Sequence, residues 1–181
     1  MIGARVWLGL SVMALLAGCS KVSTPDVNPP FAVDPRQPFH LEFGRGSGWH
    51  GLRVFILDES GLARVSRGPL DAAGTWQQTQ LQLPSKLVDE VVADINSEKL
   101  THLARTYTDV GVEDGTQWVF LLVQGSHRKV IYFDNNFPEA IKRFSSEVDG
   151  VLDRAGIAGA DWKPAERSLD KNLWDAVAER K

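Results

Sequence analysis

Apolar residues along this chain follow two spacings, one typical of strands and one typical of helices. Phe39, Leu41 and Phe43 alternate with polar residues, as expected for a half-buried strand. The same reasoning predicts further strands at 52–58, 62–66, 75–83, 117–124 and 128–134. Turn-forming residues at 58–61 and 125–126 separate two pairs of these strands. Both pairs are therefore predicted to be antiparallel hairpins.

Helical spacing is found in three segments. One apolar face follows Pro84, and Ser85 is expected to cap that helix. A second helix is predicted behind Pro138, with buried positions at Ile141, Phe144, Val148, Val151 and Leu152. A C-terminal amphipathic helix is predicted from Leu169, Leu173, Trp174 and Val177. The order of elements indicates an α+β fold, with one antiparallel β-sheet packed by two main helices and the C-terminal helix as an addition.

Composition divides the chain into four segments. Residues 1–18 hold Arg5 and an apolar run at 6–16, which is shorter than the roughly 20 residues that cross a bilayer. A charged start before such a run predicts a signal peptide. Residues 19–38 are rich in proline and are expected to form an extended tether. The α+β domain is expected at 39–157, followed by a C-terminal helical extension at 158–181.

The end of the signal peptide carries the most specific motif. Leu16-Ala17-Gly18-Cys19 resembles the lipobox of bacterial lipoproteins. That resemblance implies diacylglycerol on the Cys19 sulfur, cleavage before Cys19, and a further acyl chain such as palmitate on the new amino terminus. Cys19 is also the only cysteine of the chain. Ser20, in place of an aspartate, implies sorting to the periplasmic face of the outer membrane. The membrane, reached through lipidated Cys19, is therefore the first expected partner.

Charge narrows the choice of further partners. The chain has 20 basic and 23 acidic residues, a net charge of −3, and no long run of one sign. A protein that binds nucleic acid usually presents a strongly basic face, so no nucleic-acid partner is expected. A protein or glycan of the cell envelope remains the expected second partner.

Motifs for catalysis and cofactors are weak. Residues 46–51 fit GxGxxG, but a dinucleotide site needs a helix there, whereas 52–57 predicts a strand. The four histidines lack the spacing of metal ligands, so neither metal nor cofactor is expected. Asp109, Glu113 and Asp114 share one loop, but their spacing departs from that of a calcium-binding loop. The same carboxylates could act as an acid and base pair. No motif of a serine nucleophile is present, which makes an enzyme the less favoured reading.

Three kinds of function remain open. The leading one is a binding or scaffolding module, with Trp49, His50 and Trp174 as binding residues, because exposed aromatic side chains dominate many interfaces. The alternatives are a hydrolase or transferase that acts on the cell wall, and an inhibitor that blocks a lytic enzyme or protease with residues 44–51. The stretch 107–138 is similar to a loosely defined group of bacterial envelope lipoprotein and secreted domains. That resemblance implies the fold and no activity.

Overall fold

The strand predicted from the alternation at 39–43 extends to Ser47, although the glycine-rich sequence after Phe43 is expected to end it, and it is the central strand of a single sheet. The computed structural model describes residues 21–24, 28–47, 51–68, 75–112 and 115–165. The strands are β1 (Lys21–Thr24), β2 (Phe39–Ser47), β3 (Gly51–Asp58), β4 (Leu62–Gly68), β5 (Trp76–Gln82), β6 (Thr106–Asp109), β7 (Thr116–Gln124), β8 (His127–Asp134) and β9 (Lys163–Ala165). The helices are α1 (Ser85–Ser97) and α2 (Glu139–Arg154), with short 3₁₀ helices at Leu100–His102 and Ile157–Gly159.

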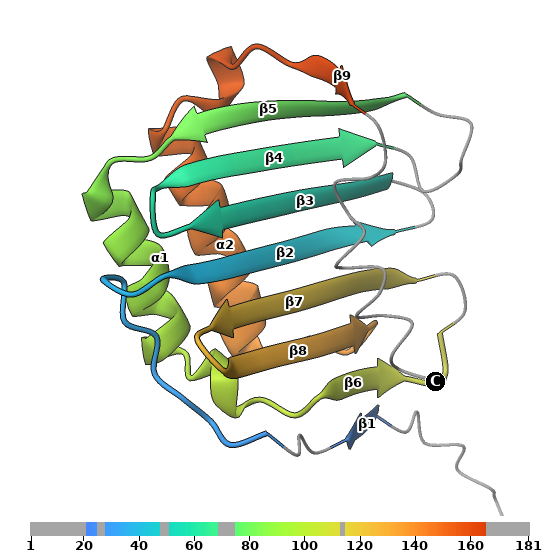
Figure 1. Ribbon diagram of the computed structural model, residues 1–181. Helices are drawn as coiled ribbons and strands as arrows, with labels where there is room; N and C mark the ends of the chain where they lie inside the picture. Colours follow the sequence, from blue (N-terminus) through green and yellow to red (C-terminus); the bar gives the residue numbers. More distant parts are fainter. Residues whose placement is uncertain (1–20, 25–27, 48–50, 69–74, 113–114, 166–181) are drawn as a thin grey trace, which may run out of the picture.

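The strands form one sheet in the order β1-β6-β8-β7-β2-β3-β4-β5-β9 (Figure 1). All neighbours are antiparallel except β6 and β8, which run parallel. Both predicted hairpins are confirmed, β3 with β4 and β7 with β8. Gly61 and Gly125 have positive φ angles of 78° and 58° in the two turns, a conformation that suits glycine. The α+β class is therefore confirmed.

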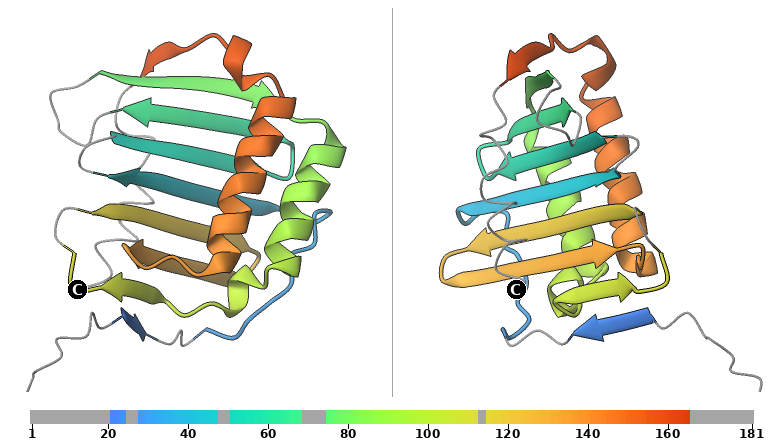
Figure 2. Two further views of the ribbon diagram at one scale, coloured as in Figure 1. Left: turned by 180° about the vertical axis from the view of Figure 1, so that it is seen from behind. Right: turned by 90° about the vertical axis from the view of Figure 1, so that its right-hand side faces the viewer.

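Helices α1 and α2 lie side by side on one face of the sheet (Figure 2). The core between the layers takes every second residue of each central strand, because side chains alternate between the two faces. Phe144 of α2 makes edge contacts with Phe43 and Phe120, whose ring centroids lie 5.3 and 5.7 Å away. All three rings are almost completely buried. Such buried aromatic contacts fix α2 above β2 and β7.

Four details of the fold differ from the sequence-based expectation. Ser85 is the first residue of α1 and not its cap, since Pro84 holds the cap position and no side chain bonds there. Residues 106–109, for which no strand is predicted, form β6. Residues 163–165, expected in the helical extension, form β9 and pair with β5. The expected C-terminal amphipathic helix otherwise falls on 166–181, outside the described residues.

The fourth difference concerns the expected tether at 19–38. Part of it is β1, which pairs with β6 at one edge of the sheet. Another part packs on the domain, because Val33 is only 4% exposed and belongs to the core. The side chain of Asn96 fixes Val33, since Asn96 Oδ1 accepts from the Val33 amide at 2.8 Å and Asn96 Nδ2 donates to the Val33 carbonyl at 2.9 Å. Residues 28–38 are therefore held by the domain, although the proline-rich composition predicts a free linker.

The substitution Asn96→Ala tests this attachment. It removes both hydrogen bonds to Val33, so the free energy of unfolding should fall by about 1–3 kcal/mol. Urea unfolding measures that change, and limited proteolysis near Phe31 should become faster. Ser97→Ala is the matched control on the same helix, because the Ser97 hydroxyl bonds only to the Asp94 carbonyl at 3.2 Å. Equal stability of the two variants would contradict the assignment.

Candidate functional site

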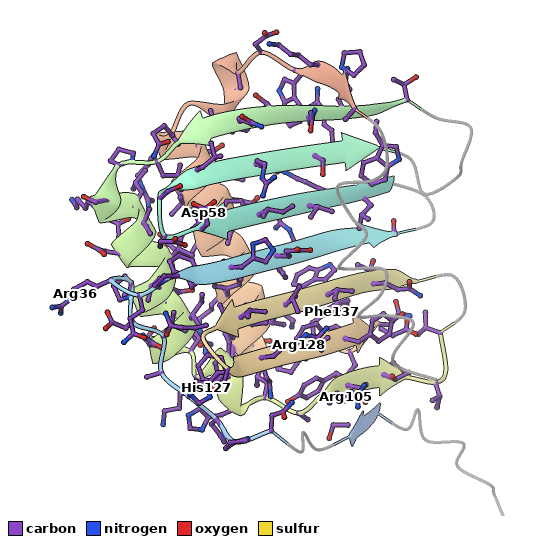
Figure 3. The ribbon with its side chains drawn as sticks, in the orientation of Figure 1. Arg36, Asp58, Arg105, His127, Arg128 and Phe137 are labelled. Carbon is purple, nitrogen blue, oxygen red and sulfur yellow. The ribbon has the colours of Figure 1, made fainter. Side chains whose placement is uncertain are left out.

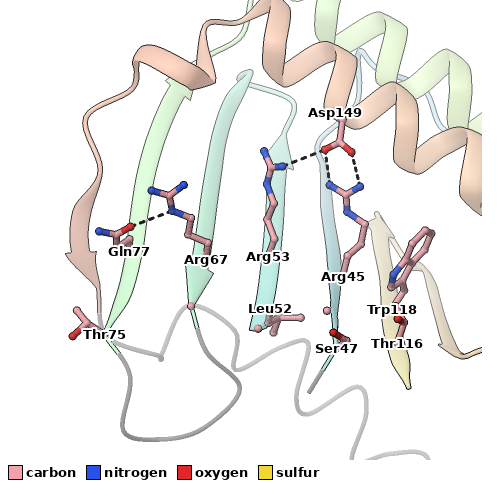
Figure 4. Close-up of a pocket in the computed structure, with 13 residues that line it drawn as sticks. Arg45, Ser47, Leu52, Arg53, Arg67, Thr75, Gln77, Thr116, Trp118 and Asp149 are labelled. Atoms are coloured by element: carbon pink, nitrogen blue, oxygen red, sulfur yellow. Dashed lines mark hydrogen bonds and ion pairs between the residues drawn. The ribbon is translucent and has the colours of Figure 1, made fainter. Parts of the chain in front are cut away.

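A cleft of about 810 Å³ lies beside α2, over the strand ends that the helices leave uncovered (Figure 4). Strands β2, β3, β4, β5 and β7 supply its floor and Asp149 of α2 supplies part of its wall. The segments 48–50 and 69–74 follow directly in sequence from strand residues that line the cleft, and they lie outside the described residues. The described part of its lining therefore comes from strands, the residue before β5, and α2.

A row of three arginines crosses this floor. The strand register places Arg45 of β2 directly opposite Arg53 of β3, and Arg53 opposite Arg67 of β4. Two residues further into the sheet, the same register aligns Phe43, Phe55 and Val65, all of them buried. Residues two apart in a strand share a face. On the face of the sheet that the helices cover, the row of buried apolar residues is therefore followed directly by the row of arginines.

Asp149 is the counterion of this row. Its carboxylate accepts from both terminal nitrogens of Arg45 at 2.6 and 2.8 Å, and from Arg53 at 3.3 Å. Arg45 also donates to the Ser145 hydroxyl at 2.5 Å and is only 15% exposed. This two-pronged geometry is the strong form of an arginine and carboxylate pair. It attaches α2 to β2 at the border of the core.

The electrostatic environment shifts two pKa values. Burial alone raises the pKa of the Asp149 carboxyl, but the hydrogen bond from Arg45 and the charges of Arg45 and Arg53 outweigh it, and the pKa lies below its ordinary value. The pKa of Arg53 is lowered, chiefly by burial and also by the neighbouring charges of Arg45 and Arg67, although Asp149 opposes the change. Arg53 therefore carries a charge that its surroundings stabilise poorly.

Arg67 has different surroundings. Its Nε donates to Gln77 Oε1 at 3.1 Å, and its guanidinium lies 4.0 Å from the centre of the Trp162 ring, a cation–π contact. Its two terminal nitrogens have no hydrogen-bond partner among the described residues. At the other end of the row, Trp118 stands opposite Arg45 and packs on Phe137 at a centroid distance of 4.5 Å. Aromatic side chains thus border the row at both ends.

The described lining is rich in positive charge. Like charges directly opposite each other in a sheet are destabilising, and Asp149 is the one carboxylate among the described residues of the lining. The same described lining contains no His, Cys or Lys that could titrate near neutral pH. Three cations against one anion leave a local surplus of positive charge in a chain whose net charge is −3. A negatively charged ligand would relieve this repulsion.

The binding and lipidation residues predicted from the sequence, Cys19, Trp49, His50 and Trp174, all lie outside the described residues. Trp49 and His50 belong to the segment between Ser47 and Gly51, two residues that line the cleft. The GxGxxG pattern leads into β3 and not into a helix, as expected.

The alternative acid and base pair receives no support from the described part. Asp109 lies on β6, and its Oδ1 accepts from the Gly111 amide at 3.2 Å in a local turn. Glu113 and Asp114 lie outside the described residues. Among the described residues, no group of three or more His, Cys, Asp or Glu side chains is placed to hold a metal ion. His127 packs against the ring of Phe31 with ring centroids 5.0 Å apart, at the turn between β7 and β8 (Figure 3), whereas the cleft residues Thr116 and Trp118 lie at the other end of β7.

Sequence reasoning missed the arginine row, although a signal for part of it exists. The predicted turn at 58–61 fixes the pairing of β3 with β4, and counting outward from that turn aligns Arg53 with Arg67. Each arginine is also two residues from an apolar core position on its own strand, Phe55 for Arg53 and Val65 for Arg67. Asp149 carries no comparable signal, because its contact with Arg45 spans 104 residues.

Neither a protein-family model nor a curated protein matches this chain. Within the described ranges, no helix has both the length and the apolar character needed to cross a bilayer.

Replacing Asp149 by Asn tests its role as counterion. Because the folded-state pKa of Asp149 lies below its unfolded value of about 3.9, the carboxylate adds stability above that pH and loses it as the pH falls through the folded pKa. Asp149→Asn should therefore be less stable than the wild type at pH 7, by about 1–2 kcal/mol because the carboxylate is partly exposed to solvent. The difference should shrink below about pH 4.

Urea unfolding between pH 3 and pH 7 measures this dependence. The control is Asp161→Asn, whose carboxylate is 82% exposed and lies 3.5 Å from Lys163, and it should change little. A difference between wild type and Asp149→Asn that stays constant over this pH range would refute the assignment.

Proposed function

We propose that this protein is a lipid-anchored binding module of the bacterial cell envelope, held on the periplasmic face of the outer membrane through Cys19. The lipobox resemblance at Leu16-Cys19, directly behind an apolar run, supports the anchor. Two or more acyl chains give stable membrane attachment where one chain is marginal. The folded domain then works at the membrane surface.

The arginine-lined cleft is the observation that carries the binding role. It offers fixed cationic donors on neighbouring strands, and its described lining has one carboxylate that two arginines already engage. Such a lining offers hydrogen-bond donors to a ligand, and its one described carboxylate is already paired with arginines. The surplus of positive charge in the described lining therefore supports a binding or scaffolding role.

Two further parts of the chain are assigned to the same role. Trp49 and His50 are proposed to contact the bound partner, because their neighbours in sequence, Ser47 and Gly51, line the cleft. The helical spacing of Leu169, Leu173 and Val177 supports an amphipathic helix in the C-terminal extension. Trp174 on that helix is proposed as a second aromatic anchor.

Metabolic labelling tests the anchor. Cells that express the full chain and are fed a palmitate analogue should yield a labelled protein whose N-terminal peptide starts at an acylated Cys19. Cys19→Ala should lose the label completely, because no other thiol exists in the chain. Ser20→Ala is the control and should keep it. A wild-type protein whose peptide carries an unmodified Cys19 would overturn the anchor.

Photo-crosslinking in cells tests the binding role. A photoreactive residue at Thr116, inside the cleft, should give a discrete adduct, because a bound partner lies within reach. The control position is Lys86, on α1, whose side chain is 87% exposed. Adducts at Lys86 that equal those at Thr116, or no adduct at Thr116, would remove the support for a cleft that binds a partner.

A further inference from the structure

We propose that the cleft binds a dianionic phosphate group between Arg53 and Arg67. This inference rests on the proposed binding function and adds the chemical class of the ligand. The phosphate could be a free ion or part of a larger envelope molecule, and both sources present the same group to the arginines.

The positions of the two arginines favour a phosphate. Arg53 and Arg67 stand directly opposite each other on neighbouring antiparallel strands, so their backbones are about 4.8 Å apart. Figure 4 shows both side chains rising from the floor on the same side of the sheet. Planar guanidinium groups donate in pairs to the oxygens of a phosphate. A phosphate between them would therefore accept from two arginines at once.

The three arginines differ in how far they are already engaged. Arg45 is committed, because it makes two hydrogen bonds to Asp149 and two to Ser145, at its hydroxyl and its carbonyl. Arg53 has a single contact with Asp149 at 3.3 Å, and Arg67 uses only its Nε, in the bond to Gln77. The donors that remain for a ligand therefore belong to Arg53 and Arg67.

Neighbouring side chains hold these donors in place before a ligand arrives. Gln77 and the ring of Trp162 fix the Arg67 guanidinium from two directions. Asp149 fixes Arg53 weakly and orients it beside Arg45. Side chains that are already ordered lose less conformational entropy on binding. The pair is thus prepared for a small anion.

The charge balance decides between kinds of anion. Arg45, Arg53 and Arg67 against Asp149 leave two positive charges in the described lining, and Asp153, which is not part of it, offsets some of the charge of Arg53. A phosphate monoester carries about −1.5 to −2 charges at pH 7 and comes close to cancelling them. A carboxylate would leave one charge over, and a neutral glycan would leave both. The dianion is the class that removes the repulsion along the row.

Calorimetry on the full lipidated chain in a nonionic detergent tests the proposal with inorganic phosphate and glucose 6-phosphate as probes. Both should bind, whereas acetate and glucose should bind at least tenfold more weakly or not at all. Affinity for both phosphates should fall as the pH is lowered from 8 to 5, because the second pKa of a phosphate monoester is about 6. It should also fall with added salt.

Variants assign the binding to the two arginines. Arg53→Ala and Arg67→Ala should each weaken phosphate binding about tenfold or more, since each removes charged hydrogen bonds. Arg53→Lys keeps the charge but loses the paired donors, so its affinity should lie between those of the wild type and Arg53→Ala. The control is Arg36→Ala, a 92% exposed arginine at the opposite end of the strands (Figure 3), which should bind phosphate as the wild type does.

The source of the phosphate is decided by a competition. Phosphatidic acid added to the micelles supplies the same group on a lipid, and displacement of glucose 6-phosphate by it, but not by phosphatidylcholine, would assign a lipid headgroup. Failure to displace would assign a soluble phosphate. Acetate that binds as tightly as phosphate, or phosphate affinity unchanged in Arg53→Ala and Arg67→Ala, would overturn the inference. In that case a crosslink from Thr116 would still support the binding module, so the two proposals fail separately.

Discussion

The cross-strand register of β2, β3 and β4 is the constraint on which both the core and the cleft depend. It places Phe43, Phe55 and Val65 in one buried line and Arg45, Arg53 and Arg67 in the next. Because side chains alternate, a slip by one residue would turn both lines to the other face of the sheet. The buried line fixes the register through its packing, and the arginines inherit their alignment from it. The free energy gained by burying the hydrophobic core therefore offsets the repulsion among the three arginines.

Asp149 links the two layers at the border where burial ends. The carboxylate comes from α2, which Phe144 holds above β2 and β7, and it engages two arginines of the sheet. Its charge compensates that of Arg45, which is only 15% exposed, and it offsets only part of the effect of burial that lowers the pKa of Arg53. The local charge therefore depends on how α2 packs on the sheet.

The sequence predicts those parts of this fold that depend on local pattern. Both hairpins follow from turn residues and alternation, and α1 and α2 follow from apolar residues at helical spacing. Strand β6 could not be predicted, because its polar residues become a strand only through pairing with β1 and β8. The attachment of residues 28–38 depends on Asn96, a side chain 63 residues away. Polar contacts at such distances leave no periodic trace.

The candidate site divides in the same way. The pairing of Arg53 with Arg67 can be counted from the turn at 58–61. The pairing of Arg45 with Arg53 cannot be counted in this way, because the length of the segment between their two strands does not define a turn type. The counterion is set by tertiary packing alone. The sequence-based hypotheses named tryptophans and a histidine as binding residues. The arginines occupy ordinary polar positions on their strands and belong to no motif.

The pairing of β1 with β6 limits how far the domain could lie from a membrane under the anchor that we propose. Lys21, the first residue of β1, is two positions after Cys19, so the acylated sulfur that we propose could sit only about 7 Å of chain from the edge of the sheet. Such a short linker would restrict reorientation of the domain relative to the membrane. Five strand spacings, about 24 Å, separate β1 from β3. A tilt of the sheet about β1 would therefore change the height of Arg53 above the membrane.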